Sequence, residues 1–481
     1  MGIFSVKSLE TLFAETEGNK ELKRSLSAVS LVLLGVGALI GAGLFVRTAA
    51  ATGSAGNGVV ISFVIAAIAC AFAGLCYAEF STAIPVSGSA YSYANYSLGE
   101  IVAWIIGWAL ILEYALGAAT VSIGWSEYLN QFLIDFFNVS LPYEWSHSPF
   151  QSYTDAAGVQ HFGNFNAIAF IVVFLITLLL IKGIEESAFI NGIIVIVKVC
   201  IVILIIVLGW QFIQPENYVP FLIPDNQPPI YGHDFSSWRN HGVTGIFGGA
   251  AIVFFAFIGF DAVSTAAQET KNPKRDMPIG ILGSLFICTI LYVLFAYVIT
   301  GLVNWEDFLN PKLGKEASIA YAINTGMPAK FAWLSKTVTI AILFGFTSVI
   351  LVMLMGQSRV FYAMSKDGLM PKLFSDIHPK YRTPYKSNII LFIFVSLIAG
   401  FVPADKTGDL TSFGTLLAFM IVCAGVWILR VKNPGLNRPF RTPLVPFVST
   451  MGVLVCGFLI FSIDAFTLEM SLLWMVLGLV F

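Results

Sequence analysis

The apolar stretch LLGVGALIGAGLFVR, at residues 33–47, contains four glycines within one helical span. Glycine weakens a helix by about 1 kcal/mol per position, so we expect the helix to break between Ile40 and Gly43. A break at membrane depth frees backbone groups that lipid cannot satisfy, and it survives where it lines a cavity or meets a ligand. The freed amides of Ala42 and Gly43 would start a half-helix that favours an anion, and the freed carbonyl of Ile40 suits an ammonium. These donors and acceptors predict half of a binding site for a solute.

A second apolar stretch, VFFAFIGFDAV, is interrupted in the same way by Gly259 and Asp261. Paired interrupted helices in corresponding places typically form a substrate site at the middle of the membrane. We expect the carbonyl groups of Phe255, Ala256 and Ile258 to be freed at this second break. The alternative for the glycine-rich stretch is close packing of helices through small residues, but two breaks together favour a solute site.

Two charged residues interrupt otherwise apolar helices. Lys198 lies in the run IVIVKVCIVIL, and a lysine at that depth is by default a functional hypothesis. Burial makes such a lysine able to gain and lose a proton, and we expect it to face the carbonyls near Gly37. The alternative is a snorkelling or structural lysine. Glu113, in WALILEYALG, either relays protons and orients the site or is a structural hydrogen-bonding carboxyl.

Two further carboxylates, Glu79 and Asp261, lie near the ends of apolar runs. We interpret them as conformational-gate residues that pair with a basic residue such as Lys274, Arg275 or Arg359. The alternative is that both are ordinary solvated charges.

Composition indicates the scaffold that must position these residues. The 481 residues are 57% hydrophobic and 11% charged, whereas soluble domains average about 25% charged residues. Apolar runs long enough to span a bilayer predict twelve helices, near residues 27–52, 57–84, 98–128, 165–182, 188–212, 242–268, 277–303, 333–362, 387–404, 409–430, 445–464 and 468–481. Most of the 26 Lys and Arg fall in segments that place the N-terminus in the cytoplasm, as the positive-inside rule requires.

Other classes of protein fit the sequence poorly. The formal net charge of −2 does not suggest a nucleic-acid partner. The six cysteines lie in apolar runs and the five histidines in polar connections, so we expect neither a disulfide framework nor a metal site. A membrane enzyme would need a nucleophile with a base at membrane depth, and no histidine lies there. The glycine-rich stretch also lacks the flanking strand and the spacing of a nucleotide-binding loop.

Four blocks distributed along the chain carry a family resemblance: GVGALIGAGLFV (35–46), YAEFSTAIPVSGSAYSYA (77–94), GFDAVSTAAQETKNPKRDMPIGI (259–281) and GQSRVFYAMSKDGLMP (356–371). In them the chain resembles the amino acid–polyamine–organocation superfamily, and most closely the bacterial twelve-helix members of the cationic amino acid transporter family. The resemblance implies an all-α membrane protein of about twelve helices, with inverted five-helix repeats and broken helices one and six. The segments would be a cytoplasmic 1–25, repeats at 26–212 and 241–430, and two additional helices at 445–481, the last one possibly clipped.

The resemblance also assigns roles to individual residues. Substrate would lie at the two breaks, with Phe255 as a lid over it. Lys198 would lie where a lysine replaces a sodium ion in proton-coupled relatives, so the proton is the coupling ion and no cofactor is expected. Met353 would face the side-chain end of the pocket. A bulky apolar residue there disfavours a long cationic side chain, so we expect small neutral substrates such as alanine.

The predicted function is secondary active transport, by proton-coupled symport of small neutral L-amino acids with alternating access. The alternatives are cationic amino acid uptake or amino acid exchange, and a sensor that binds an amino acid without moving it. The partners would be the amino acid substrate, the lipid bilayer and possibly a small single-span accessory subunit. The expected location is the plasma (inner) membrane of a bacterium.

Overall fold

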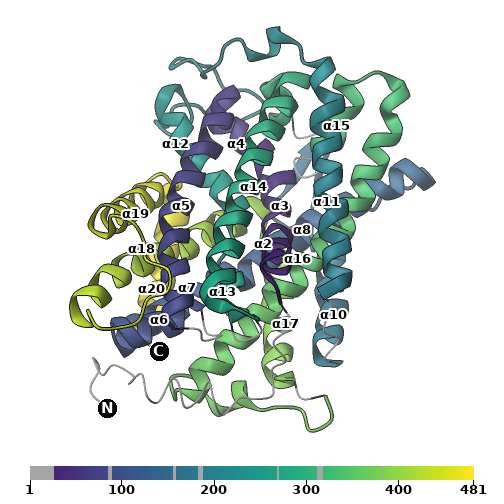
Figure 1. Ribbon diagram of the computed structural model, residues 1–481. Coiled ribbons are helices and arrows are strands. Elements are labelled where there is room, and N and C mark those ends of the chain that lie inside the picture. Colours follow the sequence, from purple (N-terminus) through teal and green to yellow (C-terminus); the bar gives the residue numbers. More distant parts are fainter. Residues whose placement is uncertain are drawn as a thin grey trace.

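The computed structural model describes residues 26–84, 89–154, 159–182, 188–267, 270–310, 318–381 and 383–480. The predicted cytoplasmic segment 1–25 lies outside these residues. The chain is an all-α membrane protein, as predicted (Figure 1). Within the described chain, seven helical segments are long and apolar enough to cross a membrane. The number is eight if the bent pair Val445–Phe461 and Ala465–Val480 forms one span. The predicted number of twelve spans is not confirmed.

The described chain is a succession of helices. In chain order they are α2 (Ala28–Leu39), α3 (Ala42–Phe45), α4 (Arg47–Ala55), α5 (Val59–Ala83), α6 (Ser89–Ser97), α7 (Glu100–Ile111), α8 (Gly117–Phe137), α9 (Tyr143–Ser146), α10 (Ala167–Lys182), α11 (Ala188–Gly209), α12 (Gly242–Val253), α13 (Ala262–Thr265), α14 (Pro273–Leu302), α15 (Ser318–Gly326), α16 (Ala332–Lys366), α17 (Tyr385–Phe401), α18 (Ala404–Lys432), α19 (Val445–Phe461) and α20 (Ala465–Val480). The axes of α19 and α20 meet at 115°.

Both predicted helix breaks are confirmed. Helix α2 ends at Leu39, Ile40 is extended, and α3 begins at Ala42. In the second stretch α12 ends at Val253, a 3₁₀ turn (η5, Phe254–Phe257) follows, and α13 begins at Ala262. Between them Gly259 has φ +116°, a conformation that is easy for glycine and strained for other residues. The sequence therefore placed the interruptions at the residues where the backbone turns.

The two broken helices lie among the long straight helices of the bundle. Helix α14 packs against both α2 and α5, and α16 packs against α8 and touches α2 (Figure 1). Side chains that face outward are large and apolar along the bundle, such as Phe286 (68% exposed) and Phe344 (66% exposed). This distribution suits a surface that lipid covers, while the breaks lie in the interior.

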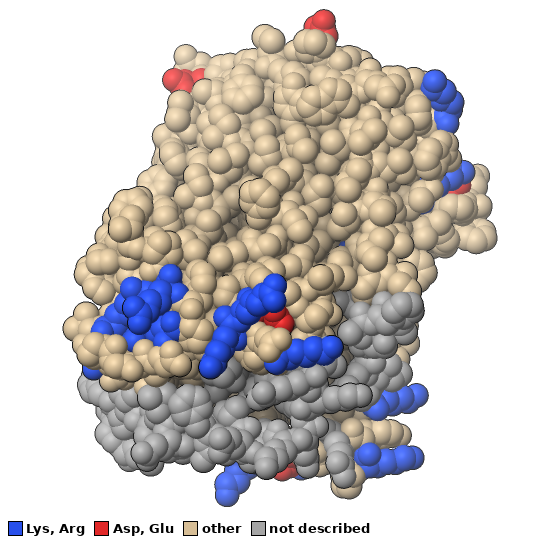
Figure 2. All heavy atoms as spheres, in the orientation of Figure 1, with Lys and Arg blue, Asp and Glu red and all other residues tan. Residues whose placement is uncertain are grey.

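Charged side chains gather at the ends of the bundle. Figure 2 shows Lys and Arg concentrated at the lower end, where α6 and the connection from α18 to α19 lie, while the broad middle is free of them on this face. The pattern matches the uneven distribution of Lys and Arg in the sequence. Which end faces the cytoplasm stays a prediction.

Several short elements, among them α9 and α15, lie outside the predicted spans, and two of them illustrate why. One is the short helix α6, which lies at the lower end of the bundle (Figure 1). The other is an antiparallel hairpin of β1 (Ser152–Thr154) and β2 (Gln160–Phe162), in the connection between α8 and α10. Both are too short and polar to register as membrane spans.

Candidate functional site

The first break exposes backbone donors and acceptors, as predicted. Within the described residues, the amides of Gly41, Ala42 and Gly43 have no backbone acceptor, and the carbonyls of Leu39 and Ile40 have no backbone donor. All five residues are buried, so these groups cannot turn to bulk water. Buried backbone groups are almost always paired, and a run of unpaired ones indicates a place for a polar ligand.

The second break is less open than predicted. The carbonyl of Phe255 accepts the amide of Ile258 at 3.3 Å, and the carbonyl of Ala256 accepts the Tyr292 hydroxyl at 3.0 Å. Of the three expected carbonyls, that of Ile258 alone has no donor among the described residues. The expectation that all three are free is therefore wrong for two of them, because the 3₁₀ turn and a neighbouring tyrosine satisfy them.

Phe255 differs from the other phenylalanines of its turn. Phe254 packs its ring on Phe419 at 5.7 Å, and Phe257 packs on Tyr292 at 5.2 Å. Within the described chain, Phe255 has no ring partner, although it is 4% exposed. The ring is buried within the hydrophobic core, and its role as a lid stays a prediction.

The two breaks touch each other. A Cβ on Gly43 would lie 2.1 Å from the Cα and 2.6 Å from the amide nitrogen of Ala256. The half-helix α3 therefore packs directly on η5, and Gly43 is needed for that approach. Close packing, one of the two alternatives from the sequence, is therefore present: the glycine brings the second break against the unpaired amides of the first, and the solute site stays a prediction.

Helix α16 closes another side of the first break. Val349 contacts it, since a Cβ on Gly41 would lie 3.1 Å from the Val349 side chain. Met353, one turn later, lies against Gly117 of α8: a Cβ there would be 2.6 Å from its Sδ. Both are buried. Sequence reasoning selected Met353 and missed Val349, since a valine in an apolar helix carries no signal of its own.

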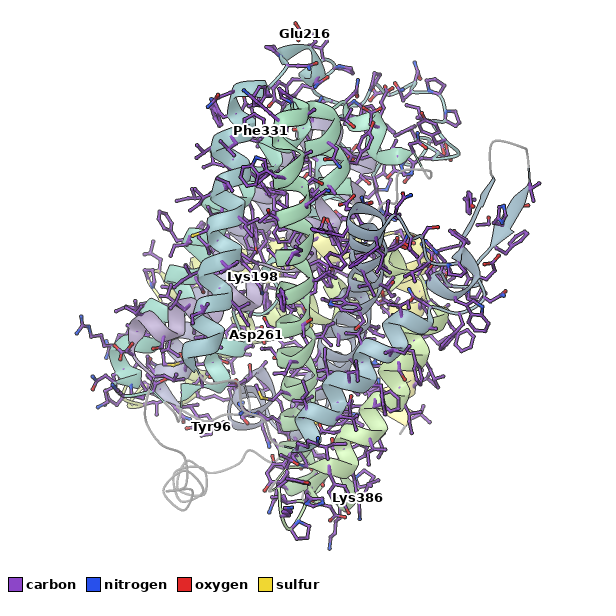
Figure 3. The ribbon with its side chains drawn as sticks, turned by 90° about the vertical axis from the view of Figure 1, so that its right-hand side faces the viewer. Tyr96, Lys198, Glu216, Asp261, Phe331 and Lys386 are labelled. Atoms are coloured by element: carbon purple, nitrogen blue, oxygen red, sulfur yellow. The ribbon has the colours of Figure 1, made fainter. Side chains whose placement is uncertain are left out.

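Lys198 lies where predicted. Its ammonium donates hydrogen bonds to the carbonyl of Gly37 at 3.1 Å and to the Ser348 hydroxyl at 3.3 Å. The side chain is 3% exposed, and Figure 3 shows it about midway between Glu216 at one end of the bundle and Lys386 at the other. One lysine thus joins α11 to α2 and α16, immediately before the first break.

A narrow crevice lies beside this lysine. Lys198 is the charged residue in its lining, which is otherwise apolar. The remaining lining residues are Ile40, Phe45, Ile201, Ala341, Ile342, Gly345 and Phe346. The crevice therefore lies between α11, α16 and the first broken helix.

Glu113 and Asp261 lie next to each other and are fully buried. Glu113 belongs to a π-helical turn (Leu112–Leu116) between α7 and α8, and Asp261 belongs to the second break. The Tyr114 hydroxyl donates to Asp261 at 2.8 Å. Glu113 is also close to Thr415, but no hydrogen bond of ordinary geometry satisfies its carboxyl oxygens within the described chain.

Asp261 is consequently not a solvated charge at a helix end. The expected pairing of Asp261 with Lys274, Arg275 or Arg359 is wrong, since its partner is Tyr114. Its side chain is 0% exposed, and Figure 3 places it near the middle of the bundle, a little below Lys198.

Glu79 pairs with other arginines than expected. Its carboxylate accepts two hydrogen bonds from Arg430, at 2.9 and 2.6 Å, and lies 3.2 Å from Arg438. It also accepts the amide of Thr442 at 2.8 Å. These partners belong to the end of α18 and the connection to α19, so the predicted partners Lys274, Arg275 and Arg359 are wrong for Glu79 too. The carboxylate joins α5 to that connection.

One ion pair near the first break was not predicted. Arg47, the first residue of α4, is 2% exposed and forms an ion pair with Asp409 of α18. The sequence signal existed, since an arginine directly follows the broken stretch. Its partner lies 362 residues away, and spacing alone cannot identify it.

Comparisons with known proteins agree with the geometry. A sequence model of the amino acid permease family matches residues 26–481. The branched-chain amino acid permease BcaP of Bacillus subtilis is 42% identical over 99% of this chain and 96% of its own. The methylthioribose transporter of the same organism is 38% identical over the same shares, 99% and 96%. The vacuolar cationic amino acid transporter 4 of Arabidopsis thaliana is 35% identical over 87% of this chain and 65% of its own.

Proposed function

Because the chain belongs to the amino acid permease family, and so is a membrane transporter rather than an enzyme, we propose that it performs proton-coupled symport of small neutral L-amino acids such as alanine. Transport would be secondary active and proceed by alternating access. The observation that carries this proposal is Lys198, whose ammonium is buried between the Gly37 carbonyl and the Ser348 hydroxyl. The protein would lie in the plasma membrane of a bacterium, with its N-terminus in the cytoplasm.

The energetics of Lys198 support proton coupling. A hydrogen bond to a charged group contributes about 1.5–3 kcal/mol, so the two bonds hold α2, α11 and α16 together by roughly 3–6 kcal/mol. Loss of the proton weakens both bonds, and a shift of about 5.5 kcal/mol moves a two-state equilibrium from 1:99 to 99:1. A neutral hydrogen bond still contributes about 0.5–1.5 kcal/mol, so loss of the proton would bias this equilibrium by part of that amount rather than reverse it alone. No sodium ion is needed in this scheme, since the ammonium takes its place.

The backbone of the breaks supports amino acid binding. The unpaired amides of Ala42 and Gly43 would bind the carboxylate, and the carbonyls of Ile40 and Ile258 would bind the ammonium. Since the two breaks touch, substrate would enter only when α3 and η5 separate, with Phe255 closing over it. The repeats 26–212 and 241–430 would rock against each other in this cycle.

The side-chain end of the site favours a neutral substrate. Val349, Phe45 and Ile258 lie at or beside the breaks, and Met353 lies one turn beyond Val349; all four are apolar and buried. An apolar lining discriminates weakly between side chains that differ by a methylene, so it accepts alanine and larger aliphatic substrates alike. The name of the B. subtilis relative, a branched-chain permease, agrees with this class.

A second candidate is uptake of cationic amino acids. The buried carboxyls of Glu113 and Asp261 favour it, since one Asp261 oxygen and both Glu113 oxygens have no hydrogen-bond partner in the described chain. A cationic side chain that reached them would satisfy this pair. Otherwise Glu113 serves the proton relay and Asp261 the gate. Exchange without net proton movement is a further alternative, as is a sensor that binds an amino acid without moving it.

The test is uptake of radiolabelled alanine, leucine and arginine into proteoliposomes under an imposed proton gradient. Wild type is compared with Lys198→Ala, and valinomycin with potassium fixes the membrane voltage. For one proton per substrate, a gradient of one pH unit supplies about 1.4 kcal/mol and permits about tenfold accumulation. We expect wild type to accumulate alanine and leucine and Lys198→Ala to lose this accumulation while it still binds alanine.

Each other outcome selects one alternative. Uptake that ignores the gradient and requires amino acid inside the vesicles would identify an exchanger. Arginine uptake without alanine uptake would identify the cationic alternative. Binding with no flux of any of the three would identify a sensor. Co-purification of a small single-span protein would identify the accessory subunit considered above.

A further inference from the structure

The side chain of Lys198 crosses α16 at a glycine. A Cβ on Gly345 would lie 2.7 Å from Cε, 3.4 Å from Cδ and 3.5 Å from Cγ of Lys198. Cβ atoms essentially never approach another heavy atom within 3.0 Å. The lysine stem therefore occupies the space that any side chain at position 345 would need.

The same turn of α16 also holds the end of the lysine. Ser348, three residues further on, accepts a hydrogen bond from the ammonium at 3.3 Å and donates one to the Gly345 carbonyl at 3.2 Å. Gly345 thus makes room for the stem, and through Ser348 it orients the oxygen that receives the ammonium.

Large apolar side chains also line the space beside the stem. The crevice around it is lined by Ile40 and Phe45 on one side, Ile201 of α11 on another, and Ile342 and Phe346 of α16. Phe346 is 0% exposed and Ile342 is 1% exposed, and close-packed side chains of this kind do not yield space cheaply. A group that displaced the stem from Gly345 would therefore displace the ammonium from its two acceptors.

We propose that Gly345 is a positioning residue for proton coupling, because the absence of a side chain there fixes the Lys198 ammonium between Gly37 and Ser348. This inference rests on the proposed role of Lys198 in proton-coupled transport. Gly345 does not touch substrate or proton. It acts through the lysine, and a side chain at position 345 would uncouple transport from the proton gradient without removing any ionisable group.

The size of the expected displacement follows from the distances. To restore an ordinary contact of 3.4 Å, Cε must move by about 0.7 Å from the 2.7 Å position. The hydrogen bonds of the ammonium already measure 3.1 and 3.3 Å, near the 3.2 Å limit of good N–H···O geometry. A shift of that size breaks at least one of them and leaves a buried cation partly unpaired.

A double-mutant cycle on thermal stability tests the contact itself. Gly345→Ala is prepared in wild type and in Lys198→Ala, in which the stem is absent. We expect a lower Tm from the substitution in wild type and an unchanged or higher Tm in the Lys198→Ala background, because alanine is the better helix former. Gly192→Ala is the matched control on α11, where a Cβ would meet an ordinary contact of 3.8 Å, so its Tm should not fall.

Gradient-driven uptake tests the functional part. We expect Gly345→Ala to lose the roughly tenfold accumulation per pH unit and the pH dependence of uptake, while the exchange of alanine across the membrane keeps its KM. Gly192→Ala should accumulate substrate as wild type does. If the substitution only damaged the fold, exchange and accumulation would fall together. Loss of accumulation with exchange retained is therefore the informative result.

Three results would overturn the inference. One is accumulation by Gly345→Ala at the wild-type level. Another is an equal loss of Tm in both backgrounds, which would mean that the added methyl group meets something other than Lys198. The third is failure of the double variant Lys198→Ala/Gly345→Ala to fold when Lys198→Ala folds. If wild type itself ignores the gradient, the proposed function fails, while the Tm cycle still decides whether Gly345 positions the lysine.

Discussion

Replacing Gly43 with alanine would separate the two helix breaks. The new Cβ would lie 2.1 Å from Cα and 2.6 Å from the amide nitrogen of Ala256. An ordinary van der Waals contact begins at 3.4 Å, which is about 1.3 Å longer than the shorter of these distances. Helix α3 and η5 must therefore move apart by about that much. Overpacking of this kind costs about 1–3 kcal/mol.

The cost falls on the closed state of the transporter. If α3 and η5 must touch for the site to close, a penalty of 1–3 kcal/mol lowers the closed population and the uptake rate about 5- to 150-fold. The amide of residue 43 remains, so binding of the substrate carboxylate should suffer less than the rate. We expect a large fall in the initial rate of alanine uptake into proteoliposomes, with a smaller change in alanine-dependent thermal protection.

Two further variants control this experiment. Gly41→Ala would place its Cβ 3.1 Å from a methyl group of Val349, which would have to give way by only a few tenths of an ångström, so its effect on uptake should be much smaller. Ala256→Gly should not rescue Gly43→Ala, because the closest contacts are to backbone atoms. Wild-type uptake by Gly43→Ala, or full rescue by Ala256→Gly, would refute the reasoning that backbone contact between the breaks closes the site.

Three other substitutions have defined outcomes. Glu79→Gln should lower the free energy of unfolding by roughly 3–5 kcal/mol in chemical denaturation, because it leaves Arg430 and Arg438 without their carboxylate. A loss below about 1 kcal/mol, which is what an exposed ion pair contributes, would contradict this prediction. Asp409→Asn should reduce Tm and uptake because Arg47 stays buried without its partner, whereas Lys406→Ala, which removes the more exposed pair with Asp464 at 3.7 Å, should change neither appreciably. Burial raises the pKa of Asp307, so the folded state disfavours its charged form. Asp307→Asn should therefore raise Tm slightly at pH 7. The difference in Tm between variant and wild type should vanish at a pH below the ordinary carboxyl range, where the wild-type side chain is neutral as well. A constant difference in Tm across that pH range would contradict it.

Local sequence signals predicted the backbone of the site. The glycines near residue 41 and the Gly259–Asp261 interruption weaken a helix by themselves, so both breaks could be placed before any tertiary contact was known. Lys198 was similarly informative, because an ammonium inside an apolar helix must find acceptors and the broken helix supplies them.

Pairings between distant segments could not be predicted. Glu79 was expected to meet basic residues of the 270s or Arg359, and it meets Arg430 and Arg438, because a charge pattern does not identify which helix end becomes the neighbour. The adjacency of Glu113 and Asp261 likewise depends on how the π-helical turn packs on the second break. Val349 shows the remaining difficulty: an apolar residue in an apolar helix acquires its role only from what it faces.

The ion pair of Glu79 has a consequence for the synthesis of the protein. Its partner Arg430 is made 351 residues later, and the amide of Thr442 follows 363 residues after Glu79. At about 5–20 residues per second, the ribosome needs roughly 20–70 s to produce them. During that interval the inserted helix α5 carries a carboxylate without its cation. The native contacts of Glu79 at this end of α5 therefore form only after α18 and its connection to α19 have been made.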